Sequence, residues 1–207
     1  MAAENEGILG EVRDFLSSLA LELPLVFKPA PPKPAARPAP SGRLHKRVPY
    51  KGKDLPLLVL EAPEARRSEI VEEADGLRLL RGRDREAPQA VLREWLVDRA
   101  REAFAERAAY WAPRLEVRYE RLTIRDQRTV WGSCTRAGHL SFNWRIVMAP
   151  PEVLDYLVIH ELSHLREMNH SKRFWAVVAS QCPEWRAHRR WLRDHSGRLK
   201  GAVRREA

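Results

Sequence analysis

The sequence has few features of exported, membrane-spanning or disulfide-bonded proteins. Only two cysteines occur in 207 residues, Cys134 and Cys182, which is too few for a disulfide framework. No apolar run approaches the roughly 20 residues that a membrane-spanning helix needs. The first residues are Met-Ala-Ala-Glu-Asn-Glu, which are acidic where a secretory signal is basic. These absences predict a cytoplasmic location and no membrane partner.

Acidic residues are scarce in two segments near the ends of the chain. Residues 28–53 and 186–205 each contain eight Lys or Arg, and Asp194 is the lone acid of the second segment. With a net charge of +9, these basic ends would suit a nucleic-acid backbone, so nucleic acid is a candidate partner. A solubilising basic surface explains the same residues equally well.

The remaining composition is that of a globular protein, with 44% hydrophobic and 31% charged residues. Residues 1–23 have apolar side chains at three- and four-residue intervals, which predicts an amphipathic helix. Residues 24–44 are rich in proline and basic side chains, which predicts a disordered linker. The main domain is expected over residues 45–200, followed by a basic tail over 201–207.

The main domain has the pattern of an α+β fold. A small antiparallel sheet is expected between Pro56 and Arg81, with a hairpin at Asp75-Gly76. Alternating side chains predict a strand over 115–124. After a turn at Gly132, they predict a pair of strands split at Ala137-Gly138, the second of them over 138–146. The predicted helices run over 88–111, ended by Pro113; from Pro150-Pro151 onwards; from the cap Ser171 onwards; and from Pro183 to about His195, ended by Gly197.

The motif that carries chemistry is His160-Glu161-Leu162-Ser163-His164. Positions i and i+4 share one face of a helix, so both imidazoles can reach one ion. His170 follows six residues later and becomes a third ligand if the helix ends near 167–169 and the chain turns back. Three neutral imidazoles and one water form an open, catalytic kind of zinc site, so we expect one zinc ion per chain.

Glu161 lies beside the first ligand, where its carboxylate can hold a metal-bound water without binding the metal. It would accept the proton of that water during attack on a carbonyl and hand it to the leaving amine. The pattern therefore predicts a zinc-dependent hydrolase with a peptide or protein substrate.

Four blocks of residues together resemble the YgjP-like metallopeptidase family, which is related to the SprT-like and WLM zinc proteases. They are Arg128-x-x-Trp131-Gly132-Ser133-Cys134, Gly138-x-Leu140-x-Phe142-Asn143, the His160–His164 motif, and Asn169-His170-Ser171 with Phe174-Trp175. The resemblance covers about residues 45–195 and leaves the first forty-odd residues outside. It implies a zincin-like fold, zinc on His160, His164 and His170, and Glu161 as the acid/base.

Several neighbours of the motif are candidate supporting or substrate-contacting residues. Arg128 is a candidate donor to the oxyanion, with a structural salt bridge as its alternative. Asn143 belongs to a block of the resemblance, and Asn169 would orient His170 or cap a helix end. The strand over 138–146 is a candidate open edge on which an extended peptide adds.

The other cysteine and histidine residues have weaker claims to function. Cys134 is either a redox-sensitive thiol, a latency ligand of the metal, or a buried structural cysteine, the last being commonest. His139, His188 and His195 lack ligand spacing to the motif.

Two further functions compete with the peptidase. Nucleoside triphosphate pyrophosphatase activity has been associated with YgjP-like proteins, but the sequence has no carboxylate cluster for Mg²⁺ and no Gly-rich phosphate loop. The SprT-like and WLM relatives act on protein crosslinked to DNA, which together with the basic ends makes a DNA-associated protease the other alternative.

Overall fold

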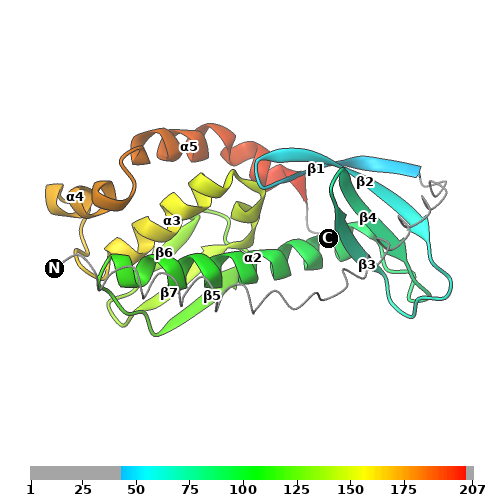
Figure 1. The fold of residues 1–207 in the computed structure, drawn as a ribbon, viewed down its shortest axis with the longest axis horizontal. Coiled ribbons are helices and arrows are strands. Elements are labelled where there is room, and N and C mark those ends of the chain that lie inside the picture. The colour runs from blue at the N-terminus through cyan, green and yellow to red at the C-terminus, as the bar shows by residue number, and fades with distance from the viewer. Residues whose placement is uncertain (1–42, 204–207) are drawn as a thin grey trace, which may run out of the picture. The chain divides into compact units, whose positions relative to one another are not determined.

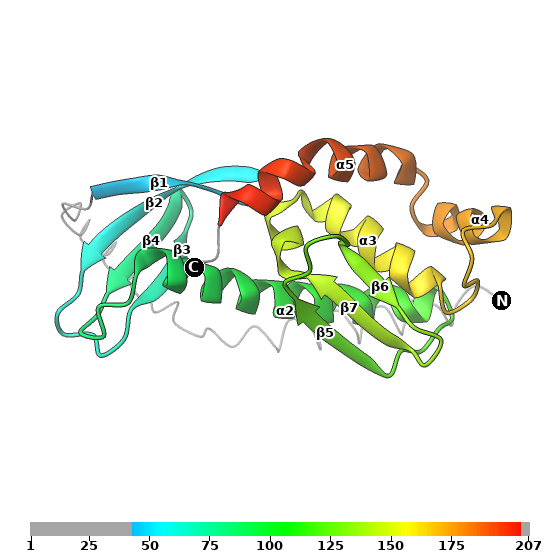
Figure 2. The same ribbon diagram turned by 180° about the vertical axis from the view of Figure 1, so that it is seen from behind.

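The computed structural model describes residues 43–203. The predicted N-terminal helix, nearly all of the predicted linker and the last four residues lie outside the described residues. The described chain has a mixed α+β fold with two sheets (Figures 1 and 2). Its strands are β1 (Arg43–Tyr50), β2 (Lys53–Glu61), β3 (Glu69–Glu73), β4 (Gly76–Arg81), β5 (Arg121–Arg125), β6 (Gly132–Cys134) and β7 (His139–Asn143). Its helices are α2 (Pro88–Arg114), the 3₁₀ helix η1 (Trp144–Met148), α3 (Pro151–Ser163), α4 (Lys172–Gln181) and α5 (Trp185–Ala202).

The first sheet has the strand order β1-β2-β4-β3. Its β3–β4 hairpin confirms the prediction at Asp75-Gly76, since Glu73 pairs with Gly76 across the turn. The sheet is mixed, however, because β2 and β4 run parallel, so the expectation of an antiparallel sheet was wrong for this pair. Strand β1 was not predicted; it pairs with β2 through Lys51-Gly52, both of which have positive φ, as in a two-residue hairpin turn.

The second sheet has the order β5-β7-β6, with β5–β7 parallel and β6–β7 antiparallel. The strands predicted over 115–124 and 138–146 are both shorter in the structure, where they are β5 and β7. After α2 the chain first hydrogen-bonds back to the end of the helix, with Val117 N–H donating to Ala112 O at 3.0 Å. Pairing with β7 therefore begins only at Arg121. Strand β7 ends at Asn143 because its side chain accepts from Arg145 N–H at 3.0 Å and starts the buried η1 helix.

Helix α2 contacts both sheets, through β3 and β4 of the first and β5 of the second (Figure 1). Pro88 occupies its first turn, where the missing N–H costs nothing. Its buried side recurs at three- and four-residue steps, as predicted, and Pro113 lies inside the last turn, one residue before the end. The buried residues are Val91, Leu92, Leu96, Ala100, Phe104, Ala108 and Ala112.

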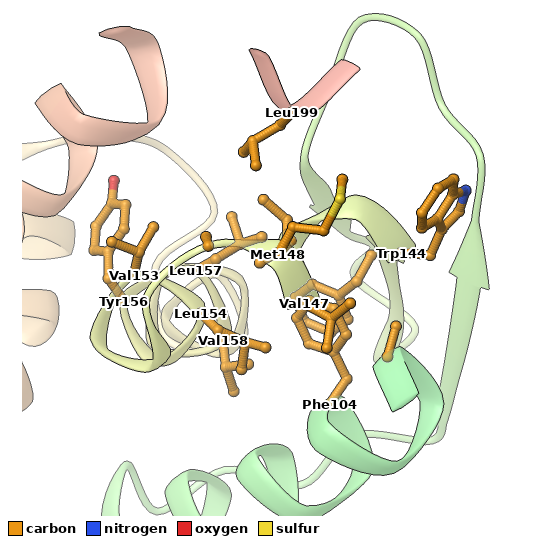
Figure 3. Close-up of a cluster of buried hydrophobic side chains, with 14 of the residues drawn as sticks. Phe104, Trp144, Val147, Met148, Val153, Leu154, Tyr156, Leu157, Val158 and Leu199 are labelled. Carbon is orange, nitrogen blue, oxygen red and sulfur yellow. The ribbon is translucent and has the colours of Figure 1, made fainter. Parts of the chain in front are cut away.

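Helix α3 begins at Pro151, as predicted, and is the centre of the core between α2 and α5. Figure 3 shows Leu154 and Val158 facing the side where Phe104 lies, with Tyr156 on the other side of α3. The Arg107 guanidinium of α2 donates to Asp155 of α3 at 2.8 Å and fixes the two helices side by side. One face of α3 is therefore held in the core, and the other is free to carry polar groups.

Helix α5 continues through Gly197 to Ala202, so the predicted end at Gly197 was wrong. Leu192 and Leu199 are buried two turns apart, and this contact outweighs a cost of about 1 kcal/mol for a helical glycine. The buried Arg145 side chain donates to Val203 O at 3.3 Å and ion-pairs with Asp126. Within residues 43–203, no helix combines the length and the apolar character that crossing a membrane requires.

Candidate active site

The structure brings the three predicted ligands together at the end of α3. His160 lies in its last turn, His164 is the residue that caps it, and His170 comes from the connection to α4. Their ligand atoms all lie within 4.8 Å of one another, and the Nε2 atoms of His160 and His170 are 3.1 Å apart. Two nitrogens on one tetrahedral zinc ion are about 3.3 Å apart, given bond lengths near 2.0–2.1 Å. The spacing therefore fits a shared ion.

The return of His170 needs no glycine. After Ser163 the chain continues as a tight turn, in which the Arg166 and Glu167 N–H groups both donate to Ser163 O at 3.1 and 3.0 Å. Glu167 does not adopt the left-handed conformation that favours glycine. Among the described non-glycine residues, only Lys51, Arg85 and Glu116 have a positive φ. Ser171 then caps α4, accepting from Phe174 N–H at 3.3 Å as its position in the sequence predicted.

Aromatic rings hold the imidazoles in place. The fully buried Phe174 ring lies 4.9, 4.5 and 4.7 Å from the rings of His160, His164 and His170. Trp175 lies 5.7 Å from both His160 and His170. His160 Nδ1 is buried without a hydrogen-bond partner among the described residues. Packing against these rings therefore sets its orientation in place of the hydrogen bond that metal ligands usually make.

The electrostatics of the cluster favour the metal-binding form of histidine. Burial, followed by the positive charges that His164, His170 and Arg189 can carry, lowers the pKa of His160 to about 3. Burial and the neighbouring His170 also lower the pKa of His164. Because a metal binds the neutral imidazole, these two donors need lose no proton at neutral pH. The donor set and its spacing fit a zinc ion.

Glu161 is buried beside the cluster, with 4% of its surface exposed. Burial raises the pKa of its carboxyl to about 8 in the metal-free protein. The Glu161 carboxyl group lies against Gly132 of strand β6. Strand β6 contacts α3 (Figure 2). A Cβ atom built on Gly132 would lie 2.5 Å from Glu161 Oε1, closer than such atoms approach in proteins. The glycine of the Trp131–Cys134 block thus makes the space that Glu161 occupies.

The free energy of unfolding of the metal-free protein should depend on pH through Glu161. Between pH 4.5 and 8 the folded protein keeps a proton that the unfolded chain releases, so unfolding becomes easier as pH rises. In this window, the free energy of unfolding of the wild type, measured relative to that of Glu161→Gln, should fall by up to about 1.4 kcal/mol per pH unit. Urea unfolding with a chelator present, at several pH values, measures the difference.

The matched control for that measurement is Glu152→Gln, an exposed glutamate in the first turn of the same helix. Its difference from the wild type should stay nearly constant with pH. A Glu161→Gln difference that is equally flat would show that Glu161 is ionised in the folded, metal-free protein.

The cleft that contains the cluster has a volume of about 680 Å³. Its walls come from the loop before β6, from α3 and α4, and from α5. The lining residues are Thr129, Val130, Trp131, Gly132, Tyr156, Leu157, His160, Glu161, His170, Trp175, Arg189, Leu192, Arg193 and Ser196. His160, His170 and Glu161 are thus reachable by a substrate of several residues.

The supporting residues suggested by the sequence have different positions. Asn143 is fully buried and holds the cleft loop, since its side chain donates to Gln127 O at 2.6 Å and its N–H to Trp131 O at 2.8 Å. Arg128 is exposed in the same loop, next to the lining residues but not among them. Asn169 is exposed, and its carbonyl accepts from Ser171 N–H at 2.7 Å.

Cys134 is half-buried on β6 and is not part of the histidine cluster. Burial, and then the charge of Glu161, raises the pKa of its thiol to about 11. Without a metal ion beside it, a thiol in this state is protonated at neutral pH and is a poor nucleophile. Of the three readings of Cys134, the structural one fits these observations best.

Several cleft residues were missed by sequence reasoning. Tyr156 lies one turn before His160 on α3, so the four-residue spacing Tyr156-His160-His164 was a usable signal. Burial raises the pKa of its hydroxyl to about 12, and it is therefore a neutral donor. Arg189 and Arg193 come from α5, and nothing in the sequence connects them with the motif.

Over most of its length, the chain is similar to one protein family. The sequence profile of the YgjP-like metallopeptidase domain matches residues 13–195. It begins well before residue 45, so the expectation that the first forty-odd residues lie outside the family pattern was wrong. No curated protein matches the chain.

Among solved structures, the chain is similar to the crystal structure of the metallopeptidase zymogen of Pyrococcus abyssi abylysin. The identity is 21%, the TM-score is 0.40, and the alignment covers 45% of this chain and 93% of that one. The family match, by contrast, spans most of the sequence and includes the histidine cluster, Glu161 and Gly132. This chain belongs to the YgjP-like family of metallopeptidases.

Proposed function

We propose that this protein is a zinc-dependent peptidase in which His160, His164 and His170 hold the metal and Glu161 transfers the proton. The observation that carries the proposal is the convergence of three imidazoles, two of them with Nε2 atoms 3.1 Å apart, beside a buried carboxyl group in an open cleft. When bound, zinc supplies a Lewis acid for the substrate carbonyl and lowers the pKa of a coordinated water.

The chain's own residues carry the rest of the reaction. Glu161 accepts the proton of the attacking water and donates it to the leaving amine. Gly132 keeps that carboxyl group beside the cluster. Tyr156, a neutral hydroxyl in the cleft wall, is a better candidate to donate to the oxyanion than Arg128, which does not line the cleft.

A substrate strand would add to β6 rather than to β7. The sequence suggested the strand over 138–146 as the open edge, but β7 lies between β5 and β6 and has no free edge. Strand β6 is one of the two outer strands of the second sheet, and both Trp131 and Gly132 line the cleft. Backbone pairing there would place an extended peptide across Glu161 with little demand on its side chains.

The two alternative functions stay predictions. A nucleoside triphosphate would find arginines in the cleft, but the described residues contain no carboxylate cluster suited to Mg²⁺, since the metal-binding group there is all histidine. The DNA-associated alternative depends on basic residues, many of which lie on α5.

Metal analysis joined to substrate comparison tests the proposal. The purified protein should bind about one zinc per chain, and hydrolysis of an unfolded protein should fall with chelation and return in proportion to added zinc. His170→Ala should lose zinc on dialysis, while His139→Ala, which changes an exposed histidine outside the cluster, should keep it. Hydrolysis of nucleoside triphosphates but not of peptides would contradict the peptidase assignment.

A further inference from the structure

One face of α5 forms a wall of the cleft. Arg189, Leu192, Arg193 and Ser196 line it at steps of three, one and three residues, which place them on the same side of the helix. This wall lies next to the metal ligands, because α5 packs on α3. It thus adds two arginines to a site whose chemistry is otherwise complete.

Arg189 lies close to the histidine cluster. Its guanidinium carbon is 5.3 Å from the centre of the Trp175 ring, and that ring is 5.7 Å from the rings of His160 and His170. These two distances together are shorter than four residues of extended peptide, at about 3.5 Å per residue. A group bound by Arg189 would therefore belong to the substrate segment next to the scissile bond.

Arg189 has no carboxylate partner among residues 43–203 within ion-pair distance. Several other arginines of the described chain form such pairs, as Arg107 does with Asp155 and Arg145 with Asp126. Arg193 has only an exposed contact, between its Nε and its neighbour Asp194 at 3.1 Å. The Arg189 guanidinium lies over the Trp175 ring at cation–π distance, and its N–H donors have no carboxylate acceptor among residues 43–203.

We propose that Arg189, assisted by Arg193, binds a carboxylate group of the substrate, so that the protein prefers peptides with an acidic group within a few residues of the cleaved bond. This rests on the proposed peptidase function. The planar fork of a guanidinium matches a carboxylate in two parallel hydrogen bonds. The carboxylate comes from an Asp or Glu side chain or from the C-terminus of the substrate, and both sources offer the same chemistry.

Matched peptides test the preference and its source. A single glutamate is moved along a short neutral peptide and compared with glutamine at each position, and each peptide is made with a free or an amidated C-terminus. For the wild type, the best acidic peptide should exceed its neutral partner about tenfold in kcat/KM, mostly through KM. In Arg189→Gln this ratio should fall to about one.

Two variants sharpen the test. Arg190→Gln removes an exposed arginine of the same helix that does not line the cleft, so the ratio should stay at the wild-type value. Arg189→Glu should reverse the preference towards lysine in place of glutamate at the same position. An unchanged ratio in Arg189→Gln, or no reversal in Arg189→Glu, would overturn the proposal.

Binding separates this proposal from the peptidase assignment. In a Glu161→Gln background, fluorescence anisotropy of the labelled acidic and neutral peptides should give the same roughly tenfold ratio of Kd, lost on adding Arg189→Gln. If zinc-loaded protein cleaves no peptide, the peptidase assignment fails, yet this ratio still decides the role of Arg189. Equal Kd values for both peptides, with Arg189-dependent binding of a nucleoside triphosphate, would show that Arg189 binds a phosphate group and not a carboxylate.

Discussion

Replacing Glu161 by glutamine is expected to lower kcat on peptide substrates about 10³-fold or more, while the chain keeps its zinc. Glutamine has nearly the shape of glutamate but cannot accept the proton of the attacking water. It also removes no metal ligand, since the predicted ligand atoms belong to the three histidines. Single-turnover hydrolysis of an unfolded protein and zinc analysis of the same sample measure both effects.

The control on the same helix is Glu152→Gln. The Glu152 side chain is exposed and lies about two helical turns before His160. This variant should retain wild-type kcat. A Glu161→Gln protein that keeps its zinc and hydrolyses peptides within about tenfold of the wild type would exclude Glu161 as the general base. Loss of zinc in this variant would instead mean that Glu161 supports the metal site itself.

Local signals in the sequence predicted the elements that present the site. Two prolines open α3, Ser171 caps α4, and the spacing of His160 and His164 places both at one end of α3. These features depend on backbone conformation over a few residues, where the chemistry of proline, serine and helix periodicity is decisive. The α+β class and the β3–β4 hairpin followed from the same kind of signal.

Contacts between distant segments were beyond such reasoning. The closeness of Gly132 to Glu161 depends on β6 packing on α3, and the same glycine reads in sequence as an ordinary turn residue. The position of Arg189 depends on α5 folding back over α3. The length of α5 was underestimated because the burial of Leu199 outweighs the local effect of Gly197. Tertiary burial overrides propensity at these positions.

Gly132→Ala is expected to lower kcat about 100-fold without releasing zinc. The added Cβ would lie 2.5, 2.8 and 2.9 Å from Oε1, Cγ and Cδ of Glu161, so the carboxylate must move. The displaced group is the end of a side chain rather than backbone, so we expect the fold to persist at a cost of about 1–3 kcal/mol. Peptide hydrolysis, zinc content and urea unfolding measure the three consequences.

A second glycine provides the matched control. A Cβ atom on Gly197 of α5 would have no atom within 4 Å, and Gly197 does not line the cleft. Gly197→Ala should therefore keep full activity and raise the free energy of unfolding by up to about 1 kcal/mol, because alanine favours a helix. The two variants make the same chemical change, so any difference in kcat reflects the place of Gly132 beside Glu161.

The double variant Gly132→Ala with Glu161→Gln decides how Gly132 acts. If the glycine serves only to position the Glu161 carboxyl group, its substitution should lower kcat little further once that group has been replaced, because both changes remove one function. A full additional 100-fold loss in the double variant would contradict this. An additional increase in KM would instead indicate that Gly132 helps to bind the substrate strand along β6, where the backbone of the peptide must come close to that of the enzyme.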